Sequence, residues 1–455
     1  MFQRGLFIFR RDLRVFDNIA LNTLHEKCEN IYPIFIFTPE QITSKNAFKS
    51  DKAVQFMLEC LDDLEDQTAG KLQTFYGKNT SIIVDCIRTW NIDVVAFNVD
   101  YSPYAMKRDA EIVEVCKRMN VQVLTAHDYY MNIPGSILTV GGTPYQKFTP
   151  YYEVAHKKRV DAPKIKRNMR FVSSNGGVSH TISLDDAKRR FCAYGDKAIQ
   201  GGRDNALEQM RRFSRIQTRY AVERNDMSED TSGLSAYIKF GCVSIREVYA
   251  AFKHANMFIR QLYWRDFYAN ILYVFPHVLG KAMKPKYVRI KWRYNAAWFK
   301  AWCEGRTGFP IVDAGMRQLN ETGWMHNRAR LIVASFLVKT LLISWEHGEK
   351  YFAQRLVDYD PASNNGNWQW VAGTGADSQP YFRIFNPTEQ GKRYDSDCEY
   401  IKKWIPELGG LSPREIHRWT ENEDMYGVRG YPKPICDYRE QKEEALKMYA
   451  DVFKA

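Results

Sequence analysis

The sequence contains no Cys-x-x-Cys pair, no apolar run long enough to cross a bilayer, and no internal repeat or low-complexity tract. Its nine cysteines therefore show neither zinc nor redox spacing, and a chain of 455 residues needs no disulfide framework. The opening residues, MFQRGLFIFRRDLR, interrupt their apolar run with arginines and lack a small-residue cleavage site, which predicts a buried strand and not a signal peptide. We therefore expect reduced cysteines in an intracellular protein, in the cytoplasm or the nucleus depending on the source, with no membrane partner.

Acidic residues are in the minority, with 53 Asp and Glu against 65 Lys and Arg and a net charge of +12. A basic chain favours a polyanionic partner, and nucleic acid is the leading candidate, although basic surfaces also occur without one. The length exceeds the size at which a single core stops growing, so two or more domains are expected.

The first 128 residues alternate between short apolar runs and segments with helical spacing. The apolar runs predict buried parallel strands at 6–10, 31–38, 72–77, 93–100 and 121–128, separated by helices at 52–69, 79–91 and 103–119. This alternation predicts a doubly wound, Rossmann-like α/β domain over 1–128, whose ligands bind at the carboxyl ends of the strands.

The texture changes twice after this domain. Residues 129–200 are rich in glycine, proline and serine and include the basic run 157–170, which predicts a connector lying over the surface; a basic run is more often a solvated face than a DNA contact. Residues 201–455 have mostly helical periodicity and hold ten of the eleven tryptophans. The expected fold class is thus an α/β domain followed by an all-α domain.

The segment DTSGLSAYIKFG (230–241) places three hydroxyl groups, on Thr231, Ser232 and Ser235, just before an apolar helical run. Ser235 is the expected N-cap, and the free N–H groups at a helix start can bind phosphate. From these residues alone, a phosphate site and a helix cap without a ligand both remain open.

A pair of acids, Asp358 and Asp360, precedes the unusual stretch NNGNWQW (364–370). Paired carboxylates suggest acid–base chemistry or a metal site. However, no nearby histidine or cysteine has ligand spacing, and the arginines of 322–337 suggest ion pairing instead. We therefore expect no metal, and we expect His326 to be a hydrogen-bonded residue and not a ligand.

Six ordered segments resemble the DNA photolyase/cryptochrome flavoproteins over nearly the whole chain. They are FRRDLRVFDN (9–18), TSGLS (231–235), LYWRDFY (262–268), TGFPIVDAGMRQL (307–319), TGWMHNRAR (322–330) and NNGNWQW (364–370). The chain is most similar to the class I-type enzymes that repair cyclobutane pyrimidine dimers. This resemblance implies that the helical domain over 201–455 binds FAD and DNA, that 1–128 is the antenna-type domain, and that 129–200 connects them.

The resemblance also implies the residues that hold FAD. The hydroxyls named above would bind the diphosphate, Arg330 and Asp358 would form an ion pair beside the isoalloxazine, and Asn364 would face flavin N5. A carboxamide can present a donor or an acceptor to N5, whereas a carboxylate would disfavour an anionic reduced flavin. The full implied set is Tyr220, Thr231, Ser232, Ser235, Arg265, Asn327, Arg330, Asp358, Asp360 and Asn364.

Three tryptophans match the family's electron-transfer chain. Trp368 corresponds to its flavin-proximal member, Trp345 to the middle one and Trp292 to the outer one. Indole gives up an electron more readily than other side chains, so such a row can reduce photoexcited flavin.

Other positions match the pocket that receives a flipped pyrimidine dimer of UV-damaged DNA. Trp264 and Trp370 would be its aromatic walls. Asn327 and Leu331 would contact the bases, Gln261 would hydrogen-bond the thymine edge, and Arg224 and Arg328 would bind phosphates. The enzymes of this type usually carry a glutamate at the position of Gln261.

Three functions compete within the family: cyclobutane-dimer repair, (6-4) photoproduct repair and light sensing by a cryptochrome. The (6-4) branch carries histidines at positions 327 and 331, where this chain has Asn327 and Leu331. Asn364 is the repair-type residue at N5. We therefore favour a monomeric, light-driven cyclobutane-dimer lyase, with an antenna chromophore (8-hydroxydeazaflavin, folate or FMN) in the α/β domain. A further alternative is a helical nucleic-acid-binding protein without flavin. In that case the hydroxyls of 231–235 and the three tryptophans would have no function.

Overall fold

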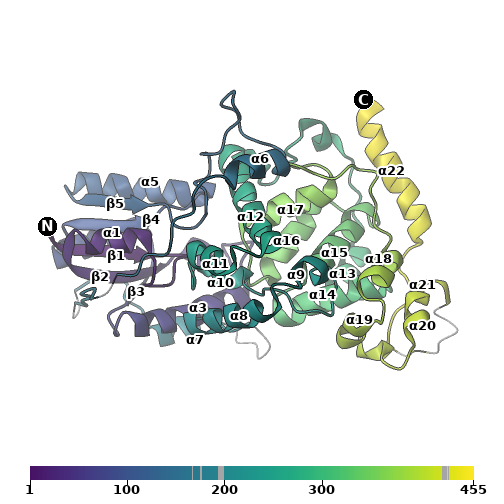
Figure 1. Cartoon of the computed structure of the whole chain (residues 1–455), viewed down its shortest axis with the longest axis horizontal. Coiled ribbons are helices and arrows are strands. Elements are labelled where there is room, and N and C mark those ends of the chain that lie inside the picture. The colour runs from purple at the N-terminus through teal and green to yellow at the C-terminus, as the bar shows by residue number, and fades with distance from the viewer. Residues whose placement is uncertain (167, 175–176, 193–198, 423–427, 429, 455) are drawn as a thin grey trace.

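The computed structural model describes residues 1–166, 168–174, 177–192, 199–422, 428 and 430–454. Figure 1 shows a sheet domain at one end of the molecule, a larger helical part at the other, and the C-terminal helix along its outer edge. No helix among the described residues is long and apolar enough to cross a membrane.

The sheet is parallel, with the strand order β3-β2-β1-β4-β5. Its strands are β1 (Phe2–Phe9), β2 (Cys28–Phe37), β3 (Gln73–Tyr76), β4 (Val94–Asn98) and β5 (Gln122–Ala126), and its helices are α1 (Ile19–His25), α2 (Pro39–Ile42), α3 (Asp51–Gln67), α4 (Asn79–Trp90) and α5 (Pro103–Arg118). Every predicted strand and helix is present, so the doubly wound prediction is confirmed.

Successive side chains of β1 point to opposite faces of the sheet. Leu6 and Ile8 pack in a core with residues of α4 and α5, whereas Phe7 and Phe9 pack with residues of α1 and α3. The core around Phe7 and Phe9 continues into the helical part of the molecule. Both faces of the sheet are thus covered by helices, which explains why the central strands are apolar on both faces.

The connector is more than the surface link that its composition predicts. It forms α6 (Phe148–Ala155) and α7 (Leu184–Phe191), and it pairs with the sheet through the bridges Ile31–Phe171 and Phe75–Thr181. Both helices bury their apolar side chains, so these segments belong to the core. Residues 167, 175–176 and 193–198 of the connector lie outside the described residues.

The rest of the chain is helical, as predicted. The helices are α8 (Arg203–Ile216), α9 (Tyr220–Glu223), α10 (Ser235–Phe240), α11 (Ile245–Phe252), α12 (Asn256–Val274), α13 (Ala296–Glu304), α14 (Pro310–Thr322), α15 (Asn327–Lys339), α16 (Trp345–Arg355), α17 (Pro361–Ala372), α18 (Pro387–Tyr394), α19 (Glu399–Trp404), α20 (Pro413–His417), α21 (Trp419–Asn422) and α22 (Tyr438–Lys454), with 3-10 turns η1 (Pro276–Val278), η2 (Pro285–Arg289) and η3 (Pro406–Leu408).

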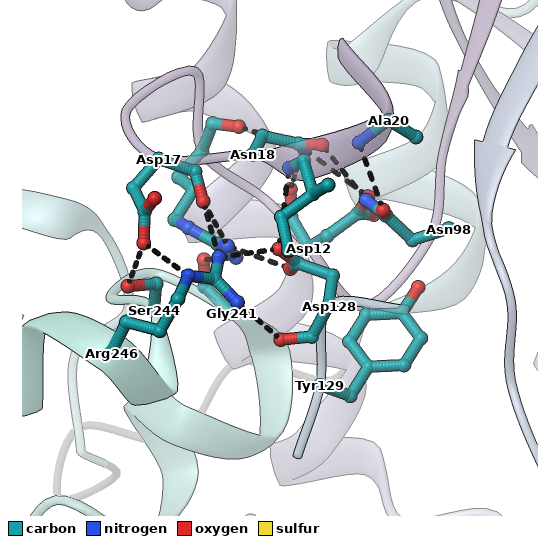
Figure 2. A network of polar contacts seen from close by, with 12 residues as sticks. Asp12, Asp17, Asn18, Ala20, Asn98, Asp128, Tyr129, Gly241, Ser244 and Arg246 are labelled. Carbon is teal, nitrogen blue, oxygen red and sulfur yellow. Dashed lines mark hydrogen bonds and ion pairs between the residues drawn. The ribbon is translucent and has the colours of Figure 1, made fainter. Parts of the chain in front are cut away.

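A buried ionic cluster joins the two parts (Figure 2). Arg246 of α11 contacts Asp17 at 2.8 Å and Asp128 at 2.6 Å, and Arg14 contacts Asp128 at 2.6 Å. Although burial alone would raise it, these two guanidinium groups hold the pKa of Asp128 below its usual value. Buried ion pairs therefore hold the α/β domain against the helical part, and removing one partner would leave a buried charge unpaired at a large cost in stability.

Candidate functional site

A cavity of about 100 Å³ opens where α15, α16 and α17 meet. Seven of the predicted site residues contribute to its wall, although they lie on separate elements. They are Asn327, Arg330, Leu331, Asp358, Asp360, Asn364 and Trp368.

The predicted ion pair between Arg330 and Asp358 is present, with a distance of 2.8 Å from Nη2 to Oδ2. Ser235 Oγ donates a hydrogen bond to the same oxygen of Asp358 at 2.6 Å. The other oxygen of Asp358 is buried and has no partner among the described residues. The Asp358 carboxylate therefore binds both the Arg330 guanidinium and the Ser235 hydroxyl, which are far apart in the sequence.

The prediction that Ser235 caps its helix is wrong. The N-cap of α10 is Leu234, no side chain caps it, and Ser235 is the first helical residue. Gly233, with a positive φ of 59°, turns the chain just before the helix, which begins one residue earlier than predicted. The hydroxyl is consequently free to bond Asp358.

Asp360 has two partners. It is the N-cap of α17, accepting from Ser363 N at 2.9 Å, and its Oδ2 lies 3.3 Å from Arg11 Nη1. Burial would raise its pKa, but Arg11 and Arg265 together hold the pKa of Asp360 below its usual value. Sequence reasoning missed this role of Arg11, whose only signal is its place at the end of the first strand.

The amides of NNGNWQW divide their tasks. Asn364 Nδ2 donates to the backbone oxygen of Glu349 at 3.0 Å, and since that oxygen can only accept, Asn364 Oδ1 is left as an acceptor at the cavity wall. Asn365 and Gln369 are buried and donate to the backbone oxygen of Val278, each at 3.0 Å. Asn364 and Asn367 therefore line the cavity, whereas Asn365 and Gln369 brace α17.

The glycine of this stretch has a steric cause. A Cβ at Gly366 would lie 2.1 Å from Cδ1 of Tyr268, so α17 approaches α12 closely there. A similar contact occurs at Gly348, where a Cβ would lie 2.1 Å from Cη2 of Trp368. Both glycines let α17 pack against its neighbours.

The three chain tryptophans occupy adjoining elements. Trp368 is 2 % exposed and Trp345 is 1 % exposed, and α16, which Trp345 begins, contacts Trp368 through Gly348. Trp292 is partly buried and precedes Arg293, which pairs with Ile343 just before α16. Trp368 thus lines the cavity, Trp345 is buried on the adjoining helix and Trp292 is partly exposed; their role as an electron-transfer row stays a prediction.

A fourth indole was missed by sequence reasoning. Trp302 is fully buried, and its ring centroid lies 6.2 Å from that of Trp368 in an edge-to-face arrangement. Its Nε1 donates to Val333 O at 3.0 Å. Nothing in its local sequence distinguishes it from an ordinary core residue.

Of the predicted lesion residues, Gln261, Trp264 and Trp370 lie on α12 and α17, which pack together, whereas Asn327 and Leu331 lie on α15. Trp264 and Trp370 are both partly exposed, and Gln261 Nε2 donates to Met257 O at 3.1 Å. Arg265 donates to Tyr129 O at 2.6 Å and lies over the Tyr130 ring at 4.3 Å. It therefore ties α12 to the start of the connector, and one of its buried nitrogens has no partner among the described residues.

The two predicted phosphate contacts lie near each other. Arg328 donates to Asn225 Oδ1 at 2.7 Å and lies over the Tyr394 ring at 4.2 Å. Burial, Arg224 and Arg393 all lower the pKa of Arg328, because three cations gather at one place. Such a cluster suits a phosphate group.

Five predicted cofactor residues do not line the small cavity: Ser235 and Arg265, described above, and Tyr220, Thr231 and Ser232. Thr231 and Ser232 precede α10, where Gln209 Nε2 donates to Ser232 O at 2.9 Å, and Tyr220 lies on α9 against Phe213. Thr231 and Ser232 precede the helix that carries Ser235, and the role of these residues as diphosphate ligands stays a prediction.

His326 is the N-cap of α15, where its Nδ1 accepts from Arg328 N at 3.1 Å. Its Nε2 is buried without a partner in the part of the chain that the structure describes, so the expected hydrogen bonding holds for one nitrogen only. Burial and the neighbouring Arg328 and Arg330 lower the pKa of His326 to about 4, which keeps the ring neutral near pH 7. Across the described residues, no group of three or more potential metal ligands gathers.

A larger cavity, of about 460 Å³, lies at the carboxyl ends of β1, β2 and β4. Its wall includes the basic residues Arg10, Arg11, Lys49, Arg108 and Lys239, and the acids Glu40 and Asp100. Buried guanidinium nitrogens of Arg10, Arg11 and Arg108 have no partner among the described residues. The cavity therefore offers donors to an anionic ligand, at the edge where doubly wound sheets bind ligands.

Together these features describe an α/β part and a helical part, each with a cavity that is a candidate ligand site. The profile "DNA photolyase" matches residues 6–166, and "FAD binding domain of DNA photolyase" matches residues 258–451. The deoxyribodipyrimidine photo-lyase of Alkalihalophilus pseudofirmus is 35% identical, with 97% of this chain and 96% of that protein covered. The chain belongs to the DNA photolyase family.

Solved structures agree. An archaeal photolyase from Sulfolobus tokodaii, crystallised with two FAD molecules, is 36% identical with a TM-score of 0.89, covering 99% of this chain and 100% of its own. A cryptochrome from Synechocystis superposes with a TM-score of 0.89 over 98% of this chain and 99% of its own, but at 24% identity it shows the shared fold alone.

Proposed function

We propose that this protein is a light-dependent lyase that splits cyclobutane pyrimidine dimers in DNA, with FAD held at the helical cavity. The observation that carries the proposal is the convergence of Arg330, Asp358 and Asn364 on one cavity beside Trp368, with Ser235 hydrogen-bonded to Asp358. Fully reduced FAD, when bound, would absorb light and supply the electron that opens the cyclobutane ring and then returns.

The residues fit such a cofactor. Asp358 and Arg265 each keep a buried polar atom without a partner among the described residues. Asn364 Oδ1 is an acceptor, which suits the N5–H of a reduced flavin better than the unprotonated N5 of an oxidised one. Trp292, Trp345 and Trp368 would relay electrons from the surface to the cavity.

The lesion would enter between Trp264 and Trp370. Their faces replace the stacking that a flipped dimer loses, while Arg224 and Arg328 pin its phosphates. Gln261 can hydrogen-bond the thymine edge but carries no charge to polarise the dimer. Asn327 and Leu331 provide no acid–base group at the cavity, which disfavours (6-4) repair.

The larger cavity supports an antenna chromophore as a second proposal. Its unpartnered guanidinium nitrogens favour a phosphate- or carboxylate-bearing ligand, which fits 8-hydroxydeazaflavin cofactors, folate and FMN alike. The two FAD molecules of the archaeal relative add FAD to the candidates. Titrating the protein with each, and measuring energy transfer to the bound flavin, would identify it. Arg108→Gln should weaken uptake, whereas Arg118→Gln, on the exposed side of α5, should not.

Repair is tested with a duplex carrying one thymine dimer, incubated with the reduced protein in light and in darkness, beside a duplex carrying a (6-4) photoproduct. Light-dependent recovery of thymines from the dimer alone is the expected result. Trp264→Ala should reduce binding of the lesion, while Trp419→Phe, at a buried indole of α21, should not. If neither lesion is repaired by a protein whose flavin is photoreduced, the function is light sensing instead.

A further inference from the structure

The connector helix α6 stacks on the predicted lesion wall. The rings of Phe148 and Trp264 lie 3.8 Å apart, centroid to centroid, with an interplanar angle of 8°. No other aromatic pair among the described residues is as close or as parallel. Aromatic pairs usually adopt offset or edge-to-face geometries at 4.5 to 7 Å, so this contact covers much of one indole face.

Phe148 is itself held firmly. It is 1 % exposed, and Phe267 meets it edge to face at 5.9 Å. The guanidinium carbon of Arg260 lies 5.0 Å from its ring centroid. Just before it, Gln146 O accepts from Asp377 N at 2.9 Å, which ties the start of α6 to the segment after α17. The Phe148 ring therefore has little freedom to turn away from the indole.

The stack continues along α6. Tyr152 lies 5.8 Å from Phe148 and His156 lies 4.8 Å from Tyr152, both in stacked geometry. These residues are four apart in sequence, which places them on one face of the helix. Arg260 also lies over Tyr152, at 4.6 Å. A row of rings from the connector thus supports Trp264.

We infer that Phe148 is a positioning residue for lesion recognition, one that fixes the plane of Trp264 and leaves a single indole face for a flipped base. The inference rests on the proposed lesion site. Trp264 remains partly exposed while Phe148 is buried, so an incoming base can stack only on the side opposite Phe148. Because the indole is already ordered before DNA binds, no side-chain entropy of Trp264 is lost on binding.

Replacing Phe148 by leucine keeps an apolar side chain but removes the flat face. Binding is measured in darkness, with an oligonucleotide that carries one thymine dimer and with the same oligonucleotide undamaged. We expect Phe148→Leu to weaken binding of the dimer about 3- to 10-fold relative to undamaged DNA, the effect of freeing one ordered side chain. Phe148→Tyr, which keeps the aromatic face, should restore the preference.

Phe56→Leu is the matched control, since Phe56 is a fully buried ring of α3 in the α/β domain. It should lower thermal stability as Phe148→Leu does, without changing the preference for the dimer. If Phe148→Leu binds the dimer as tightly as the parent while Trp264→Leu does not, the inference is wrong.

A readout without DNA separates this inference from the proposed function. In protein labelled with 5-fluorotryptophan, the ¹⁹F resonance that Trp264→Phe removes should be narrow, and Phe148→Leu should shift or broaden it. An unchanged resonance would overturn the positioning role even if repair is observed. A parent protein with no preference for dimer-containing DNA would instead refute the lesion site, whatever the resonance shows.

Discussion

Replacing Arg246 by methionine should lower the free energy of unfolding by about 3–5 kcal/mol, the cost of breaking a buried ion pair by removing one partner. Arg246 donates to Asp17 Oδ2 at 2.8 Å and to Asp128 Oδ1 at 2.6 Å (Figure 2). After the change, Asp128 keeps Arg14 at 2.6 Å. Asp17 keeps only neutral donors, Ser244 Oγ at 2.5 Å and the backbone N of Lys164 at 2.7 Å. The loss therefore falls on the Asp17 carboxylate.

The double variant Arg246→Met/Asp17→Asn tests this cause. Asparagine tolerates the positive φ of 48° at position 17 and carries no charge, so the double variant should be more stable than Arg246→Met alone by about 1–3 kcal/mol. Urea unfolding followed by far-UV circular dichroism measures both. Arg219→Met is the control, because its partner Glu223 is a surface residue and the change should cost less than about 0.5 kcal/mol. A loss below about 1 kcal/mol for Arg246→Met, or no recovery in the double variant, would refute the reasoning.

Three further changes test other parts of the structure. Trp345→Phe should nearly abolish light-driven reduction of bound oxidised FAD without changing FAD content, measured by bleaching of the flavin absorbance; a larger effect of Trp302→Phe would place the route through Trp302 instead. Gly366→Ala should lower stability by about 1–3 kcal/mol in thermal unfolding, because the new methyl group would overlap the Tyr268 ring, and an unchanged melting temperature would contradict the close approach. His326 has a folded pKa of about 4, below its unfolded value, so only the unfolded state gains the proton as the pH falls below the unfolded pKa. Between neutral pH and pH 4, the free energy of unfolding of the parent should therefore fall by about 3 kcal/mol more than that of His326→Asn. Equal losses in urea unfolding would show that His326 does not titrate in this way.

The sequence predicts the sheet well because its signals are local. Apolar runs such as 31–38 and 93–100 are long enough to be read without any partner, and their helices carry charged outer faces. The ion pair of Arg330 with Asp358 required family resemblance, since 28 residues separate the two. Nothing local could predict that Arg11 reaches Asp360, 349 residues away.

The connector shows the opposite limit. Its glycine- and proline-rich composition hid α6, because eight residues give too short a window for helical periodicity. Its Phe148 then looks like any aromatic residue until Trp264 is placed beside it. Short elements acquire their role from what they pack against, and sequence patterns do not carry that information.

Arg11 connects the two cavities of the molecule. It lines the larger one, while its Nη1 lies 3.5 Å from Asp100 and 3.3 Å from Asp360, which belongs to the smaller one. Asp360 also begins α17, the helix that carries Asn364 and Trp368. A ligand anion that draws Arg11 toward the sheet would therefore weaken its hold on the cap of α17.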